Sequence, residues 1–323
     1  MPLMRLIFLF AALMPLAAVA EAPLDVTNLA TLARGFPLPV LGYTQALTPG
    51  TGSMTAMLDV VNEFHANSSP DETIRIDGET QRLAVTWRRG FASGYEFGVE
   101  LPFYFQNGGM LDDIVTGFHS AIGQSNTSRD RFPARKYAFR YERPNGSVLL
   151  DRQSGSDVIG DLSLYGGWQF QPDLVLRTQL KLPTGPASRL AGNGAASASV
   201  WADYAMPWFE KDSAFSGFLS GGTGYSLLGD VLRTQQERWI LFGGGGLAWR
   251  ATSSLRLLAQ VYAHSKLYKE SGFDLLAAAP LIVSVGLRWK LGSDTELQVS
   301  FIEDAFVSPA PDYAMRLGLN WRL

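Results

Sequence analysis

Apolar and polar residues alternate along most of this chain beyond residue 50. Successive side chains of a β-strand point to opposite faces of a sheet, so each alternating run indicates a strand with one apolar and one polar face. Twelve such runs occur, near residues 53–66, 79–89, 95–106, 157–170, 174–183, 197–208, 214–226, 236–250, 254–264, 279–292, 295–304 and 313–323. The pattern predicts an all-β protein.

Six tryptophans lie at corresponding ends of these runs, each followed by a short turn or by the chain end. They are Trp87, Trp168, Trp208, Trp249, Trp289 and Trp321. Each shares the apolar face of its run, and indole favours the boundary between hydrocarbon and water. A ring of tryptophans at one height is typical of a transmembrane β-barrel. We expect Phe103, Phe105, Trp201 and Trp239 nearer the opposite boundary.

A soluble β-propeller, whose blades repeat about every 40–45 residues, is the alternative reading of the tryptophan spacing. Each interval here holds two long runs rather than four short strands, and no Gly-His…Trp-Asp signature is present. The sequence therefore favours a twelve-stranded antiparallel up-and-down transmembrane barrel. Twelve is an even number, as bacterial single-chain barrels require.

The connections between the runs alternate in length. Those that follow the tryptophan-bearing runs are short, whereas the others are longer, and the longest spans 107–156. Outer-membrane barrels have short periplasmic turns and long external loops. This alternation places the tryptophan ring at the periplasmic interface of an outer membrane, in contact with lipid.

The first 52 residues precede the barrel, which we expect over 53–323. Residues 1–20 contain Arg5, an apolar stretch and a small-x-small site, which together predict a secretory signal peptide. Residues 21–52 contain four prolines and are expected to form either a periplasmic lead-in or a plug. Export by such a signal fits the outer membrane of a Gram-negative bacterium.

Composition excludes several classes of function. The chain has no cysteine, hence no disulfide, thiolate metal site or cysteine nucleophile. Removal of residues 1–20 takes one of the 27 basic residues, leaving 26 against 30 acidic residues, which disfavours a nucleic-acid partner. No cluster with metal-ligand spacing and no phosphate loop occurs, so no cofactor and no metal are expected.

The loop 107–156 contains one helical pattern, over 111–122. Its apolar face includes Leu111, Phe118 and Ile122, with His119 at its edge. Such a short helix is marginal in water and must rest on an apolar surface. A packed cap, a mobile gate and contact with outer-leaflet lipid are the three interpretations. His119-Ser120 also suggests a lipolytic enzyme, but adjacent helix residues do not face each other, and no third group is apparent.

The inward faces of the runs carry charges of both signs. The residues that we expect to line the lumen or bind a solute are Glu100, Tyr104, Arg177, Lys181, Tyr262 and Arg288. Eight-stranded barrels are filled by side chains, whereas sixteen-stranded barrels leave a channel. A count of twelve strands therefore does not decide whether this lumen is filled or open.

Several short segments resemble known barrel families. Gly160-Asp161-Leu-Ser-Leu164 and Leu180-Lys-Leu-Pro-Thr-Gly185 resemble segments of families that include hydrocarbon-uptake channels. Gly108-Gly-Met-Leu-Asp112, Phe118-His119, Arg129 and Arg131 resemble the domain-of-unknown-function 3187 family of proteobacterial outer-membrane barrels. That family brings no assigned activity.

The last run alternates to the final residue and resembles the C-terminal strand that outer-membrane proteins present to the barrel-assembly machinery. It ends in Leu323 rather than in the usual Phe or Trp. We expect that machinery as a partner.

These observations predict a non-enzymatic outer-membrane channel for a small solute, which could be apolar, with the 111–122 helix as its gate. A structural or surface-interaction barrel with a plugged lumen is the alternative, and a lipid-modifying enzyme is less favoured.

Overall fold

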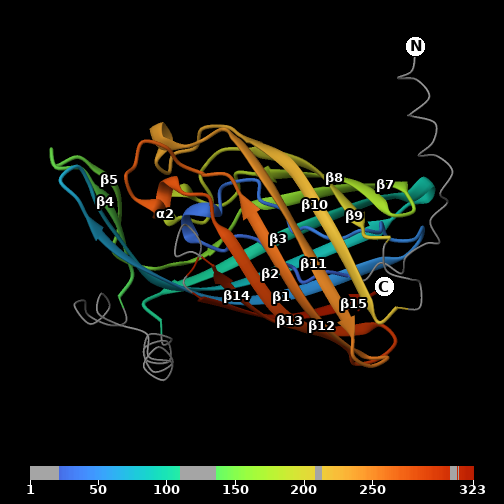
Figure 1. Cartoon of the computed structure of the whole chain (residues 1–323). Coiled ribbons are helices and arrows are strands. Elements are labelled where there is room, and N and C mark those ends of the chain that lie inside the picture. The colour runs from blue at the N-terminus through green and yellow to red at the C-terminus, as the bar shows by residue number, and fades with distance from the viewer. Residues whose placement is uncertain (1–21, 110–135, 208–212, 306–310, 312) are drawn as a thin grey trace, which may run out of the picture.

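The computed structural model describes residues 22–109, 136–207, 213–305, 311 and 313–323, and twelve of its strands form one closed antiparallel barrel (Figure 1). The predicted fold class is confirmed. The barrel strands are β1 (Gly52–Ser68), β2 (Thr73–Gly90), β3 (Tyr95–Asn107), β7 (Leu162–Gln171), β8 (Leu174–Leu182), β9 (Ser197–Ala205), β10 (Phe215–Ser226), β11 (Trp239–Arg250), β12 (Leu255–His264), β13 (Leu281–Lys290), β14 (Thr295–Asp304) and β15 (Tyr313–Arg322).

Each barrel strand pairs with its neighbours in the barrel order, and β1 closes the barrel on β15. This seam runs in register from Ser53 opposite Arg322 to Asn62 opposite Tyr313. At its end, the Gly52 amide donates to the Leu323 carbonyl at 3.0 Å and the Leu323 amide donates back at 2.9 Å. Closure leaves the barrel wall with no free strand edge. We call the end with the short connections the turn end and the opposite end the loop end.

Three short strands extend the wall at the loop end. β4 (Ala138–Glu142) pairs with the first residues of β2, β5 (Val148–Arg152) pairs with β4, and β6 (Asp157–Ile159) pairs with the far end of β3. Parts of 67–78 and 107–156, predicted as loops, are therefore strand. Ile74, Phe139 and Tyr141 in these segments are buried in a cluster with other loops and with residues of the 22–51 segment, so they do not form an outward apolar stripe.

The outward faces match the alternation. Four of the six predicted interface tryptophans, Trp87, Trp168, Trp249 and Trp289, are more than a third exposed, and Trp321 is partly exposed. They lie at the turn end of their strands, whereas Trp208 lies outside the described residues.

One aromatic prediction was wrong. Trp201, expected near the opposite boundary, is only 6% exposed and points into the barrel, where its indole N–H donates to Asp203 at 3.1 Å. It shares the inward parity of Asp203, two residues along the same strand. Trp239, by contrast, is 67% exposed at the loop end.

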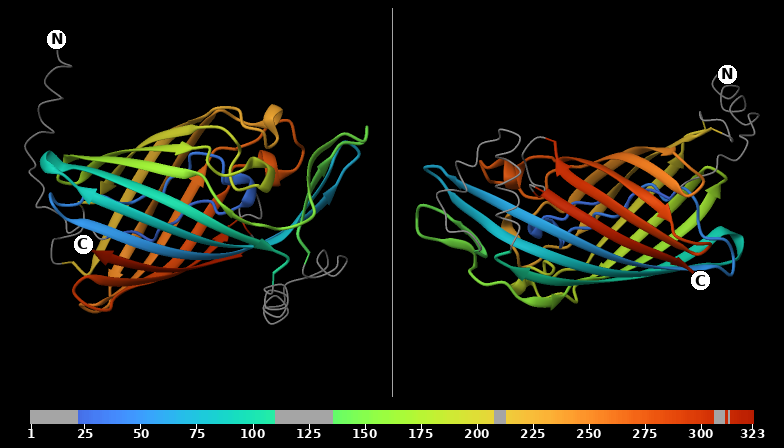
Figure 2. Two further views of the ribbon diagram at one scale, coloured as in Figure 1. Left: turned by 180° about the vertical axis from the view of Figure 1, so that it is seen from behind. Right: turned by 90° about the horizontal axis from the view of Figure 1, so that it is seen from below.

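Residues 22–51 fold inside the barrel, where Figure 2 shows the N-terminal part of the chain enclosed by the strands. We call this segment the plug. Its first leg (22–30) leads to the short 3-10 helix η2 (Thr31–Ala33), and its second leg (34–51) returns to the turn end and joins β1. Leu24, Phe36 and Leu41 are buried.

Loops close over the loop end and meet the tip of the plug. They include the helix α2 (Asp274–Ala277) and the 3-10 helix η6 (Arg233–Gln235). Ile74, Phe139, Tyr141 and Leu276, all at most 1% exposed, belong to one buried cluster with Phe36 of the plug. We call these loops and β4 the cap. Two further 3-10 turns, η3 (Ala92–Gly94) and η5 (Ala187–Arg189), lie in connections.

Among the residues that the structure describes, no helix is both long enough and apolar enough to cross a membrane.

Candidate functional site in the barrel lumen

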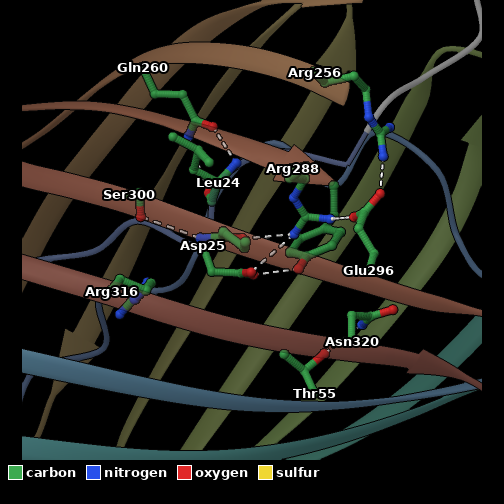
Figure 3. Close-up of polar contacts among 12 residues, drawn as sticks. Leu24, Asp25, Thr55, Arg256, Gln260, Arg288, Glu296, Ser300, Arg316 and Asn320 are labelled. Atoms are coloured by element: carbon green, nitrogen blue, oxygen red, sulfur yellow. Dashed lines mark hydrogen bonds and ion pairs between the residues drawn. The ribbon is translucent and has the colours of Figure 1, made fainter. Parts of the chain in front are cut away.

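The first leg of the plug is attached to the wall by charges and by its backbone (Figure 3). Arg288 on β13 lies 3.2 Å from the Asp25 carboxylate and 2.6 Å from Glu296, which also pairs with Arg256. One step earlier, the Gln260 side chain accepts from the Leu24 amide and donates to the Leu24 carbonyl at 3.2 Å. Gln260 thus pairs with the plug backbone as a neighbouring strand would.

The turn of the plug is held from the opposite wall. The Lys181 ammonium on β8 donates to two plug carbonyls, those of Arg34 and Phe36, each at 2.7 Å. Arg34 itself donates to the Thr80 hydroxyl at 2.7 Å, and its guanidinium lies 4.4 Å from the centre of the Tyr104 ring. The turn is therefore held from β8 and from β2 and β3.

The second leg is held by a buried ionic cluster on β3, β8 and β9. Arg177 pairs with Glu96 and with Asp203, the latter at 2.9 Å, and donates to the Tyr43 carbonyl at 2.6 Å. Asp203 also accepts from the Gly42 amide at 2.7 Å. The Tyr43 hydroxyl donates to Asp25, which joins the two legs of the plug.

A glycine in the wall makes room for the plug. A Cβ atom at Gly224 on β10 would lie 2.6 Å from the Pro37 ring. In the plug, Gly42 has φ +95°, a conformation favouring glycine, and its Cβ would meet the Phe218 ring at 2.5 Å. Gly224 is thus a place where the plug closely approaches the wall backbone.

Beside the plug lies a chamber of about 130 Å³ along the wall formed by β1, β2, β3, β7 and β8, lined by both charged and apolar side chains. Its lining includes the plug residues Asp25, Arg34 and Tyr43. The charged wall residues that line it are Arg82, Arg88, Glu96, Glu100, Asp161, Arg177, Lys181 and Arg316. The Arg82 guanidinium forms ion pairs with Glu100 at 2.6 Å and with Asp59 at 2.9 Å, so it links the two carboxylates and balances part of their charge.

The six predicted lumen residues all lie on the barrel interior. Tyr104, Arg177 and Arg288 are buried, Lys181 binds the plug, and Glu100 pairs with Arg82. Tyr262, only 2% exposed, lies away from the chamber on β12. The gate candidates Leu111, Phe118, His119 and Ile122 lie outside the described residues.

The plug residues that meet the wall were missed by the sequence reasoning, although a signal was present. Between residues 22 and 51 the only charged residues are Asp25 and Arg34. A segment that is poor in charge and rich in apolar side chains is suited to burial in a folded structure.

No group of three His, Cys, Asp or Glu side chains is placed to hold a metal ion in the part of the chain that the structure describes.

The barrel architecture is shared with outer-membrane channels. The COG4313 outer membrane channel from Pseudomonas putida F1 is 13% identical, with 87% of this chain and 98% of that chain covered, at a TM-score of 0.54. The CymD monoaromatic hydrocarbon channel is 11% identical over 93% and 98% of the two chains at 0.43. The NanC porin is 8% identical over 84% and 100% at 0.44. At these identities the likeness shows the fold alone.

Sequence comparison gives a family without an activity. The family model described as Protein of unknown function (DUF3187) matches residues 3–323. No curated protein shows significant similarity to the chain.

Proposed function

The chain belongs to the DUF3187 family, and we propose that it is an outer-membrane channel for a small polar solute, closed at rest by its own N-terminal plug. The turn end then faces the periplasm and the loop end faces outward, following the rule for loop lengths. The protein acts by passage and not by catalysis. The location in the outer membrane of a Gram-negative bacterium belongs to the same proposal.

The observation that carries this proposal is the chamber with charged lining beside the plug. A purely structural barrel needs no unfilled space along its wall, whereas a channel needs one with groups that can replace the hydration of a solute. The lining charges of both signs favour a polar solute over the apolar one included in the sequence prediction.

The plug is suited to move because polar contacts hold much of it. The contacts of Lys181, Arg177 and Gln260 with plug backbone can each be exchanged for contacts with water. Such exchanges cost about 0.5–3 kcal/mol each. A twelve-stranded wall without residues 22–50 would leave a lumen of intermediate width. Displacement of the plug would therefore widen the chamber into a pore.

The second candidate is a closed barrel with a structural or surface-interaction role, and the cap favours it. Phe36 at the tip of the plug meets the Tyr268 ring edge-on at 5.3 Å, and the Tyr268 hydroxyl donates to the Leu32 carbonyl at 2.8 Å. Plug and cap thus pack as one cluster at the loop end. Opening would have to separate them.

Planar-bilayer conductance distinguishes these functions. We expect small or rare currents from the intact barrel and large, steady currents from a variant lacking residues 22–50. A second variant, lacking residues 110–125, tests the helix predicted at 111–122, which stays a prediction together with its role as a gate. Silence of the plug-less variant in membranes where it is folded, as judged by its strand circular dichroism, would overturn the channel in favour of the closed barrel.

A further inference from the structure

A chain of hydrogen bonds joins the first leg of the plug to the end of β12. The Ala30 amide donates to Oδ1 of Asn28 at 2.9 Å, and Nδ2 of Asn28 lies 3.0 Å from Nε2 of His264. Nδ1 of His264 lies 2.7 Å from the Ser265 carbonyl oxygen. Asn28 and His264 are only 5% and 3% exposed, so this chain is buried between the plug and the wall.

The direction of each bond in the chain is fixed by its two ends. A backbone amide can only donate, so the side-chain oxygen of Asn28 accepts from Ala30 and its NH₂ group faces His264. A carbonyl oxygen can only accept, so Nδ1 of His264 carries the proton that is donated to Ser265. Nε2 must then accept from Asn28. The arrangement therefore fits only the neutral imidazole with its proton on Nδ1.

A second proton on the imidazole is incompatible with this arrangement. Both ring nitrogens of an imidazolium are donors, so the Nε2 proton would point at the NH₂ group of Asn28. Rotation of the Asn28 amide by half a turn does not remove the conflict, because the NH₂ group would then face the Ala30 amide. In either orientation a buried donor loses its acceptor, which is costly. The plug in its seated position therefore requires a neutral His264.

The groups around the imidazole favour release of the plug over a rearrangement that keeps it. Among the described residues, Asp304 at the end of β14 is the charged side chain that acts on His264. The ring of Tyr262, on the same strand, lies 6.3 Å away, and the register partner on β11 is the apolar Phe242. From the plug, the uncharged Asn28 faces the ring. An imidazolium would thus have its counter-charge in the wall and not in the plug.

We propose that His264 is a proton-operated latch, which holds the plug through Asn28 while the imidazole is neutral and releases it when the imidazole takes up a proton from water. The opening of a pore by this release rests on the proposed channel, whereas the release itself does not.

Proton linkage sets the size of the effect. In the released state the imidazole is hydrated and titrates near pH 6.5, whereas the seated state accepts only its neutral form. The stabilisation that the latch gives to the seated plug is therefore fully present above this pH and is lost as the pH falls. The ratio of released to seated plug should rise about tenfold between pH 7.5 and pH 5.5.

The tautomer of His264 is the first measurement. The chain has three histidines, so His65→Gln together with His119→Gln leaves His264 as the only one. We call this double variant, made as the full mature barrel without a histidine tag, the His264 barrel. In ¹⁵N-histidine NMR at pH 7.5, we expect a neutral ring with its proton on Nδ1. A ring with its proton on Nε2 would contradict the chain of hydrogen bonds.

Release of the plug is measured by labelling with a water-soluble maleimide. Ala33→Cys places a thiol in the turn of the plug, where the native side chain is 3% exposed, and Ala92→Cys places one on an exposed turn. Each is introduced separately into the His264 barrel. The ratio of the two rates at each pH removes the pH dependence of the thiol itself. We expect this ratio to rise about tenfold from pH 7.5 to pH 5.5.

The discriminating variant is His264→Gln in the same background. Glutamine does not titrate, and its side-chain oxygen can accept from Asn28 at any pH. The labelling ratio should then change by less than about twofold over the same range. Glu63, whose carboxylate accepts from the Thr31 amide of the plug at 3.0 Å, is kept in every variant. An acid response that came from Glu63 would therefore persist in His264→Gln.

Two labelling results would overturn the latch: a ratio that does not change with pH in the His264 barrel, or an equal rise in His264→Gln. If His264→Gln does not fold, as judged by its strand circular dichroism, the tautomer and the labelling of the His264 barrel decide. Conductance at pH 5.5 separates this inference from the proposed function. Acid-dependent labelling without current would support the latch and contradict the channel.

Discussion

Asp59 and Arg316 face each other across the seam where the first and last strands close the barrel. They are register partners, and a guanidinium N–H of Arg316 donates to the Asp59 carboxylate at 2.9 Å. Both are at most 1% exposed, and Arg82 approaches the same carboxylate at 2.9 Å from β2. The seam is therefore joined by a buried charge pair as well as by its ladder of backbone bonds.

We expect Arg316→Met to destabilise the barrel by about 3–5 kcal/mol, because it leaves Asp59 with one guanidinium partner instead of two. Urea unfolding in lipid or detergent measures this cost. Arg322→Met, at an exposed position on the same strand, is the control and should cost little. Adding Asp59→Asn to Arg316→Met should recover part of the loss. Equal costs for the two arginine variants would contradict a role of the pair in the seam.

Removal of the Lys181 ammonium should loosen the plug. Two charge-assisted bonds to the plug backbone disappear in Lys181→Met, and each contributes about 1.5–3 kcal/mol. We expect channel openings in planar bilayers to be at least about tenfold more frequent. Lys290→Met, at an exposed lysine on β13, should leave them unchanged. Identical records for both variants would show that Lys181 does not hold the plug.

The absence of native cysteine allows the plug to be followed directly. A cysteine introduced as Ala33→Cys, at a position 3% exposed in the turn of the plug, should resist a water-soluble maleimide. Ala92→Cys, on an exposed turn, should react quickly and serve as the reference. Reaction at position 33 should accelerate when Lys181→Met is added. Fast labelling in the otherwise unchanged barrel would place the plug outside the lumen.

Alanine substitutions at two glycines of β10 distinguish loss of plug contact from a general effect of alanine on the strand. Gly224→Ala should displace the plug, since its Cβ would lie 2.6 Å from the Pro37 ring. At Gly221 the nearest atom would be 3.8 Å away, so Gly221→Ala should be tolerated. The readout is maleimide reactivity at position 33 in each background. Similar reactivity in both would mean that the wall does not need the glycine at 224.

Val285 tests the outward face. Being 51% exposed on β13, it should cost about 2–4 kcal/mol when replaced by Arg at the centre of a bilayer. Val285→Leu is the control, and folding titrations into lipid vesicles give both values. A cost below 1 kcal/mol for Val285→Arg would place this face away from lipid. The sequence predicts a much smaller cost for Arg at the neighbouring Ser284. The structure reverses that expectation, since Ser284 is 1% exposed in a filled lumen.

Strand number, strand faces and closure could be predicted because alternation with period two records which side of a wall each residue occupies. The same parity correctly put Arg177, Lys181 and Arg288 inside. The same parity also predicts an inward position for Trp201, which shares the face of Asp203. The general preference of tryptophan for membrane interfaces led to the wrong prediction at this position.

The plug contacts could not be read from the same pattern. Several contacts of residues 22–51 are made by their backbone amides and carbonyls, as at Phe36 and Tyr43, and these groups are the same for every residue type. The pairing of Asp25 with Arg288 joins positions 263 residues apart. Such a contact follows from the closed wall and cannot be derived from local spacing.

The position of the plug in the chain has a consequence for biogenesis. The plug is made and exported first, yet the wall around it is completed only by the final strand, where Gly52 and Leu323 bond to each other. In the closed barrel the Lys181 ammonium binds the plug carbonyls of Arg34 and Phe36, a contact that requires both plug and wall in their final places. Assembly thus couples two events, enclosure of the plug and closure of the barrel wall. We expect a chain whose last two strands have not yet paired to leave its plug exposed.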